Sequence, residues 1–294
     1  MFDLKSYLER RQKSVEAELE RMMPAETTRP VSLHRAMRYS VMAGGKRLRP
    51  ILCLAACEAV GGRAETALLP GLAIEILHTY TLIHDDLPCM DDDELRRGRP
   101  TAHVVFGEAT ALLAGDALLT LAFEWLAQSP VPPPYNSSQL VLELATASGS
   151  QGVIGGQVED LTAEGHAPDA DLVDYIHRHK TAALLRASVR MGGMAGGASP
   201  AAMEALTQYG DCVGLAFQIA DDILNVTATA EQLGKPVGND EQLKKLTYVA
   251  VHGLDSSRQK ANELVASAVA AIRPLPGDPH PLIALAEYMV KRAS

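Results

Sequence analysis

Apolar residues recur along most of this chain at intervals of three and four, the spacing that places them on one face of an α-helix. Near the N-terminus this spacing aligns Leu33, Met37 and Val41, and the segment ends at a glycine pair that suits a helix C-terminus. The following segment has Pro50 near its start and a second glycine pair just beyond its end, the usual asymmetry of helix ends. The pattern therefore predicts two consecutive helices in this region.

A longer helix is predicted from about Asp171 to Met191, and Ser199 and Asp255 are suitable N-cap residues for two later helices. No run of alternating apolar and polar residues is bounded by hairpin turns, so we expect no strands. We therefore expect an all-α fold, a single domain over residues 1–294 with ten or more helices. Proline and glycine cluster in four predicted loops, 129–138, 163–169, 192–200 and 273–281.

The composition, 47% hydrophobic and 21% charged, supplies ample apolar material for a core. The net charge of −9 argues against nucleic acid as a partner, because phosphate backbones are bound by surplus lysine and arginine. The N-terminus is a charged helical segment and not a basic-then-apolar leader. The longest uncharged run, 125–142, contains four prolines, which does not fit a membrane span. We therefore expect a cytoplasmic protein with no membrane span.

Two pairs of aspartates follow apolar helical segments, Asp85 and Asp86 in "LIHDDLP" and Asp221 and Asp222 in "QIADDIL". A solvated helix end is the common explanation for such clusters, but carboxylates near a helix C-terminus oppose the helix dipole. The second pair also lies among core-type residues, and a buried carboxylate needs a cation. No lysine or arginine lies within ten positions of that pair. A divalent metal is therefore the economical answer, and ligands that are all oxygen favour Mg²⁺.

An EF-hand calcium loop is the other metal interpretation of the first cluster. It does not fit, because the glycine position after Asp91 is Arg96 and the terminal glutamate position is Ala102. The chain also has no P-loop and no GxGxxG pattern. Basic side chains instead gather in four segments, which suits a multiply anionic substrate bridged through metal. These segments contain Lys46, Arg47 and Arg49; Arg96 and Arg97; His177, His179 and Lys180; and Lys235, Lys244 and Lys245.

Five segments, "GGKRLRP", "HDDLPCMDDDELRRGRPTAH", "GGQVEDL", "IHRHKTAALLRASVRMG" and "FQIADDIL…GKPVG", together resemble the short-chain trans-isoprenyl diphosphate synthases. They are most similar to the bacterial farnesyl diphosphate synthases, in the family's order, from about residue 30 to the C-terminus. The resemblance implies an all-α bundle around a deep central cavity, with Mg²⁺ and two diphosphate substrates at its mouth. It also implies three Mg²⁺ ions per active site and a homodimer.

The resemblance assigns roles to individual positions. The metal ligands would be Asp85, Asp86, Asp91, Asp221 and Asp222. Isopentenyl diphosphate would be bound by Lys46, Arg49, His78 and Arg97, and the allylic diphosphate by Arg96. The allylic side would be lined by Lys180, Thr181, Gln218, Lys235 and Lys245. The residues closest to catalysis would be Asp85, Asp86, Asp221, Lys180, Thr181 and Gln218.

Product length is assigned to Tyr80 with its small neighbour Thr81. Tyr80 lies five residues before Asp85, about 7.5 Å along a helix axis, so a tail that starts at the metal-bound diphosphate would run down toward the phenol ring. In the family an aromatic residue here goes with a fifteen-carbon product. An isolated tyrosine on such a helix is otherwise a core residue.

The implied reaction is ionisation of an allylic diphosphate, attack by the isopentenyl double bond and loss of a proton. We therefore expect farnesyl diphosphate, made from isopentenyl diphosphate and dimethylallyl or geranyl diphosphate. The alternatives are a geranylgeranyl diphosphate synthase and a non-catalytic regulatory subunit of a heteromeric prenyl synthase. A terpene cyclase would share the fold but would not need "GGKRLRP". Asn225 stands where the family's second motif usually ends in aspartate, which is the one feature that favours a regulatory subunit.

Overall fold

The computed structural model describes residues 2–165, 167–227 and 246–291, and this part of the chain is mostly helical. The helices are α1 (Leu4–Met22), α2 (Val31–Val41), α3 (Leu48–Ala59), η1 (Ala64–Ala67), α4 (Leu68–Asp85), α5 (Ala102–Phe106), α6 (Glu108–Ala127), α7 (Ser137–Ser148), α8 (Val153–Thr162), α9 (Ala170–Ile176), η2 (His177–Ala182), α10 (Ala183–Ala195), α11 (Pro200–Thr227), α14 (Tyr248–His252), α15 (Leu254–Ile272) and α16 (His280–Lys291). The predictions of an all-α fold and of ten or more helices are confirmed.

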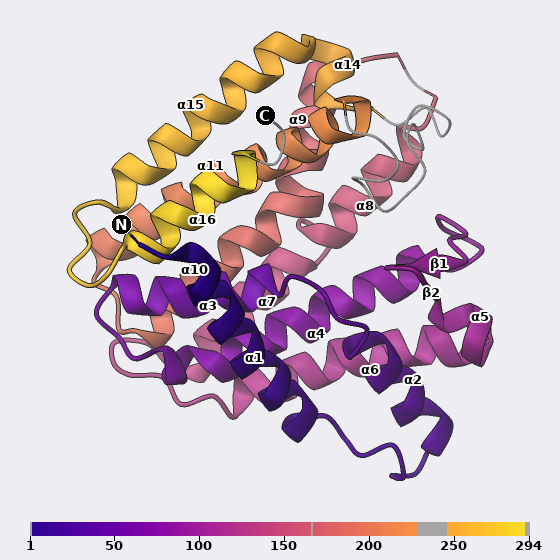
Figure 1. The fold of residues 1–294 in the computed structure, drawn as a ribbon. Coiled ribbons are helices and arrows are strands. Elements are labelled where there is room, and N and C mark those ends of the chain that lie inside the picture. The colour runs from indigo at the N-terminus through magenta and orange to yellow at the C-terminus, as the bar shows by residue number, and fades with distance from the viewer. Residues whose placement is uncertain (1, 166, 228–245, 292–294) are drawn as a thin grey trace.

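The helices pack in a sequence of neighbours across the bundle. α4 packs on α3, α3 on α10 and α10 on α11, while α6 covers α4 and α15 covers α11 from outside. Figure 1 shows α15 along one edge of the bundle and α2 at the opposite edge. One hydrophobic cluster connects Tyr7 on α1 with Met289 on α16, so the first and last helices share a core.

Glycines that were predicted to form a loop instead bring two helices together. The loop predicted at 192–200 is wrong in its first half, because α10 continues to Ala195. A Cβ on Gly192 would lie 2.1 Å from the carbonyl oxygen of Cys53 on α3. These glycines therefore let α10 approach the α3 backbone. Ser199 does receive the expected N-cap contact, from the backbone N of Ala202 at 3.2 Å.

Two other expectations differ from the structure. The N-cap of α15 is Gly253 and not Asp255, which lies in the first turn, where its charge suits the helix dipole. A short antiparallel hairpin is also present, with β1 (Leu95–Arg96) paired to β2 (Arg99–Pro100). Its turn residues Arg97 and Gly98 both have positive φ, the geometry of tight hairpin turns. Strands this short leave no alternating pattern for the sequence to show.

The helix predicted from Asp171 to Met191 is continuous but changes its winding. α9 passes directly into η2, a six-residue π-helix, and then into α10. π-helical turns are rare and often lie at functional sites. This one carries Lys180 and Thr181, two of the predicted site residues.

Within the residues that the structure describes, two helical segments are long and apolar enough to cross a membrane by length and composition alone: η1 with α4, and α6. Two thirds of the apolar window in α4 is buried inside the protein (67%), as expected of a core helix. In α6 only 39% is buried. α6 therefore exposes an apolar outer surface.

Candidate active site

A cavity of about 470 Å³ lies between α4, α6, α8 and η2. Its volume is within the roughly 300–1,000 Å³ typical of small-molecule sites. It combines polar side chains with an apolar wall, which suits a substrate that has a charged head and a hydrocarbon tail. The polar residues are Arg49, His78, Tyr80, Thr81, His84, Asp85, Gln157, Lys180 and Thr181, and the apolar wall includes Leu112, Val153, Ile154, Val158, Leu161 and Leu184.

The first acidic cluster begins where α4 ends. Asp85 is the last residue of α4, and the backbone N of Asp91 donates to the Asp85 carbonyl oxygen at 2.8 Å, so the loop folds back on the helix end. Burial raises the pKa of Asp85 to about 6, against the attraction of Lys180 and with repulsion from Asp91 and Asp86. A divalent cation would supply the positive charge that this carboxylate lacks.

Among the residues that the structure describes, no three acidic, histidine or cysteine side chains converge on one metal position. Mg²⁺ does not require such a cage, because it is usually held by one or two carboxylates together with substrate phosphates. An oxygen-only donor set around a carboxylate whose pKa is raised by burial fits that ion. The acidic clusters therefore suit Mg²⁺ that arrives with a diphosphate.

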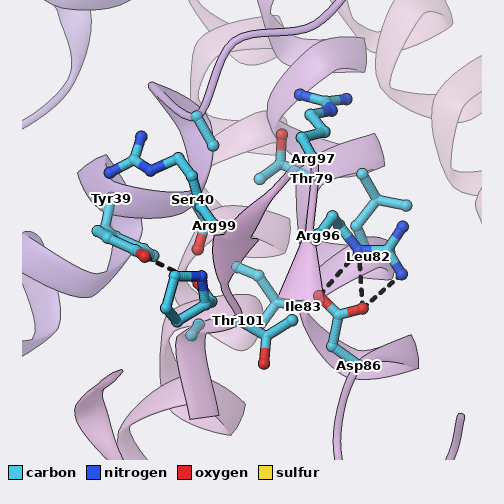
Figure 2. A pocket seen from close by; sticks show the side chains of 13 residues that line it. Tyr39, Ser40, Thr79, Leu82, Ile83, Asp86, Arg96, Arg97, Arg99 and Thr101 are labelled. Atoms are coloured by element: carbon cyan, nitrogen blue, oxygen red, sulfur yellow. Dashed lines mark hydrogen bonds and ion pairs between the residues drawn. The ribbon is translucent and has the colours of Figure 1, made fainter. Parts of the chain in front are cut away.

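Asp86 faces away from this cluster, toward the hairpin. Its side chain is only 4% exposed, and it accepts from Nε of Arg96 at 2.7 and 2.9 Å, with a further contact from Nη2. Figure 2 shows the two side chains facing each other beside a small pocket, where Tyr39 on α2 donates to the Pro100 carbonyl oxygen at 2.8 Å. In this structure the carboxylate of Asp86 thus holds the hairpin against α4.

Asp222 also has protein partners. It is 3% exposed and accepts from Nε2 of Gln218 at 3.0 Å and from the backbone N of Tyr248 at 2.6 Å, and Nε2 of His177 lies 3.3 Å away. Gln218 in turn accepts a hydrogen bond from Thr181 at 2.8 Å. The second acidic pair therefore joins α11 to η2.

Lys180 is oriented by an acidic residue on α8. Its Nζ lies 2.6 Å from Oδ2 of Asp160, which is 8% exposed. A Cβ on Gly156 would lie 2.2 Å from the backbone N of Lys180, so this glycine allows α8 to approach η2. Asp160 was not among the predicted site residues, although the segment "GGQVEDL" was noted as part of the resemblance. Nε2 of Gln157, which also lines the cavity, is buried without a partner in the described part of the chain.

A second cavity, of about 370 Å³, is lined mostly by cationic side chains. Arg49 and His78 line both cavities, so the two meet at these residues. Burial lowers the pKa of Arg49 to about 10, and burial together with neighbouring arginines holds the pKa of His78 well below its usual value. The lining is Gly45, Lys46, Arg47, Leu48, Arg49, Glu75, His78 and Arg97.

The contacts of two arginines build this basic cavity. Arg47 is 3% exposed, has a left-handed backbone (φ 50°), and donates to Glu75 at 2.8 Å and to the Val41 carbonyl oxygen at 2.7 Å. Arg97 donates to the Gly44 carbonyl oxygen, and its guanidinium occupies the space that a Cβ on Gly45 would need. The predicted set Lys46, Arg49, His78 and Arg97 is thereby brought together. Glu75 was not predicted; its signal is the single acidic residue inside an apolar helix.

The remaining predicted residues fall into four groups. Tyr80, Thr81, Asp85, Lys180 and Thr181 line the larger cavity, and Asp86 and Arg96 line the small pocket of Figure 2. Four residues do not line the larger cavity: Asp91, in the loop after α4, and Gln218, Asp221 and Asp222, on α11. Lys235 and Lys245 lie outside the described residues.

Comparison with known proteins agrees with this geometry. The polyprenyl synthetase family model matches residues 30–273. The chloroplastic geranylgeranyl pyrophosphate synthase 11 of Arabidopsis thaliana is 46% identical over 99% of this chain and 83% of its own length. The chloroplastic heterodimeric geranylgeranyl pyrophosphate synthase large subunit 1 of the same plant is 47% identical over 99% of this chain and 80% of its own.

Solved structures are similar over nearly the whole chain. The crystal structure of an FPP/GFPP synthase from Zymomonas mobilis has a TM-score of 0.86 and 37% identity, and covers 98% of both chains. Geranylgeranyl pyrophosphate synthetase from Pyrococcus horikoshii has a TM-score of 0.89 and 32% identity, again over 98% of both chains.

Proposed function

Because the chain belongs to the polyprenyl synthetase family and is a prenyltransferase, we propose that it joins isopentenyl diphosphate to an allylic diphosphate and carries the product to geranylgeranyl diphosphate. The observation that carries this proposal is the pair of joined cavities. One is lined by cations that suit a diphosphate, and the other has Asp85 and Lys180 beside an apolar wall that suits a growing tail.

The chain's own residues would bind and orient both substrates. Lys46, Arg49 and Arg97 would bind the isopentenyl diphosphate, whose double bond would then lie where the two cavities meet. Lys180, oriented by Asp160, would pair with the allylic diphosphate, and Thr181, which donates a hydrogen bond to Gln218, would turn its side-chain oxygen toward the cation that forms.

Asp85, Asp91 and Asp221 would hold Mg²⁺, which would neutralise the charge developing on the departing pyrophosphate. Asp86 and Asp222 were also expected to bind metal, and each belongs to the same acidic pair as Asp85 or Asp221; their contacts to Arg96, Gln218 and Tyr248 would position the two pairs. Arg96, which Asp86 holds in the hairpin, would then bind the allylic diphosphate.

The product length rests on the relatives. Chloroplastic enzymes named geranylgeranyl pyrophosphate synthases match 98–99% of this chain at 45–47% identity, which favours a twenty-carbon product over the farnesyl product expected from the sequence. Farnesyl diphosphate is the second candidate, because Tyr80 is 5% exposed and lines the cavity where a tail would pass.

We also propose that the protein is a homodimer formed through α6. Leu113 on α6 is 57% exposed, and only 39% of the apolar window of this helix is buried. Helices that are apolar on all sides are normally covered. The substitution Leu113→Glu should release monomers in sedimentation-velocity runs, and an unchanged sedimentation coefficient would place the interface elsewhere.

The activity test uses the purified protein with Mg²⁺, isopentenyl diphosphate and dimethylallyl, geranyl or farnesyl diphosphate. Products are dephosphorylated, extracted and identified by gas chromatography. Geranylgeraniol from all three primers supports the proposal, and farnesol that is not extended further selects the second candidate. No product from any primer would overturn both and favour a regulatory subunit.

A further inference from the structure

Gly115 on α6 leaves room for the side chain of His84, which lies between the tail cavity and the α6 backbone. His84, the residue before Asp85, lines the 470 Å³ cavity. Its Nε2 lies 3.0 Å from the Leu112 carbonyl oxygen on α6. A Cβ on Gly115 would lie 2.2 Å from that Nε2 and 2.5 Å from Cδ2 of the same ring. The imidazole therefore occupies the space that any other residue at position 115 would need.

The same ring supports the residue predicted to set product length. Tyr80 and His84 lie one helical turn apart on α4, and their rings meet edge to face, with centroids 5.4 Å apart and an interplanar angle of 85°. Both rings line the cavity. Gly115, His84 and Tyr80 thus form a row from the α6 backbone to the cavity.

Glycine is unfavourable inside a helix, and Gly115 is in the interior of α6. The contact with His84 accounts for it. A side chain at position 115 would displace the ring away from the α6 backbone, toward the cavity that the ring also lines.

We propose that Gly115 is a positioning residue for product length, which acts by letting His84 lie against α6 and so keeps the imidazole and Tyr80 out of the path of the tail. A side chain at position 115 pushes the ring into the cavity and shortens the product. This inference rests on the proposed chain elongation, but it does not depend on which product the wild type makes.

The test compares Gly115→Ala, His84→Ala and the double variant with the wild type, by product length and by thermal unfolding. The matched control is Gly193→Ala on α10, where the added Cβ would lie 2.5 Å from Cδ1 of Leu206 and the residue does not line the cavity. Gly115→Ala should shift products toward chains one five-carbon unit shorter. His84→Ala should shift them longer, and the double variant should match His84→Ala because no ring remains to be displaced. Gly193→Ala should keep the wild-type products.

Unfolding gives a second measurement that does not need activity. Gly115→Ala should lower the melting temperature in the wild-type background and not in the His84→Ala background. If Gly115→Ala does not fold, the double variant and His84→Ala still decide the question.

An unchanged product profile in Gly115→Ala, or shorter products from the double variant than from His84→Ala, would overturn the inference. A melting-temperature loss of equal size in both backgrounds would do the same. Failure of the proposed function would instead appear in the wild-type products alone.

Discussion

The two aspartate pairs are alike in sequence, but they are anchored by different partners. In each pair the second aspartate is buried, Asp86 at 4% and Asp222 at 3% exposure. Asp86 faces the guanidinium of Arg96, whereas Asp222 accepts from a side-chain amide and a backbone N–H. The first member of the first pair, Asp85, lines the cavity instead. The difference teaches that one acid of a pair can line the cavity while its neighbour fixes the scaffold, through a guanidinium in one region and through an amide, a backbone N–H and a nearby imidazole in the other.

The largest expected effect is at Asp85, the member of the first pair that lines the cavity. Asp85→Asn should lower kcat by roughly 10²–10³-fold or more, because the departing pyrophosphate loses charge stabilisation in a site that excludes water. Asp92→Asn is the matched control, since Asp92 is exposed and asparagine tolerates its left-handed backbone. Steady-state rates with saturating Mg²⁺ measure both. Equal losses in the two variants would mean that the cluster acts only through its total charge.

The next effect concerns stability and compares the two anchors. Asp86→Asn removes the buried charge that faces the Arg96 guanidinium and leaves it the longer contact with Asp93, so it should cost about 3–5 kcal/mol in the free energy of unfolding. Asp222→Asn removes the charge of a carboxylate held by an amide and a backbone N–H beside His177, and should cost about 1–3 kcal/mol. Urea unfolding measures the difference. Asp93→Asn is the control, because Asp93 is partly exposed and lies 3.4 Å from Arg96. If Asp222→Asn costs more than Asp86→Asn, the two anchors are ranked wrongly.

A smaller effect of opposite sign is expected for Asp85→Asn in metal-free protein. Burial raises the pKa of Asp85 from 3.8 to about 6, so the ionised form is disfavoured in the folded state above pH 6. That cost disappears as the pH falls from 6 toward 3.8, where the wild-type carboxyl is protonated in both states. At pH 7–8 in EDTA the variant should therefore be more stable by roughly 1–3 kcal/mol. A gain that does not shrink between pH 6 and 4 would contradict this cause.

The smallest effect is expected at the end of the second motif. Asn225 lies one helical turn after Asp221 on the same face of α11. Asn225→Asp should change the rate by only about twofold to fivefold, because the added charge is worth on the order of 1 kcal/mol near the surface, and it should lower the Mg²⁺ concentration for half-maximal rate. Activity that appears only in the variant would support the regulatory-subunit alternative.

Much of the fold could be predicted from the sequence, because apolar spacing and end residues mark helices such as α2 and α3. The winding of η2 could not be predicted, since a π-helix can contain the same apolar residues as an α-helix. The two differ in which backbone groups form hydrogen bonds. Nor could the end of α10, because Gly192 lies there to make room for the Cys53 carbonyl oxygen, and a glycine that packs looks like a glycine that turns.

For the site, the resemblance of the motifs to the family identified residues that the fold brings together, such as Lys46 and His78. It could not assign different roles to Asp85 and Asp86, since the position of Arg96 in space decides which carboxylate faces the hairpin. Glu75 was missed for the same reason. Its partner Arg47 is distant in sequence, and only their contact at 2.8 Å explains a charge inside α4.

The π-helix η2 determines how the protein would respond to the deletion of one residue between α9 and α10. A π-helical hydrogen bond joins residues five apart where an α-helical one joins residues four apart, so the turn takes up one extra residue within the helix. Deleting one residue between Ile176 and Ala183 would remove that extra residue and restore regular winding between α9 and α10. The deletion would leave the helix intact, but Lys180 would no longer face Asp160 and Thr181 would no longer face Gln218. A loop would absorb such a deletion, whereas here it would change the direction of two side chains of the candidate site.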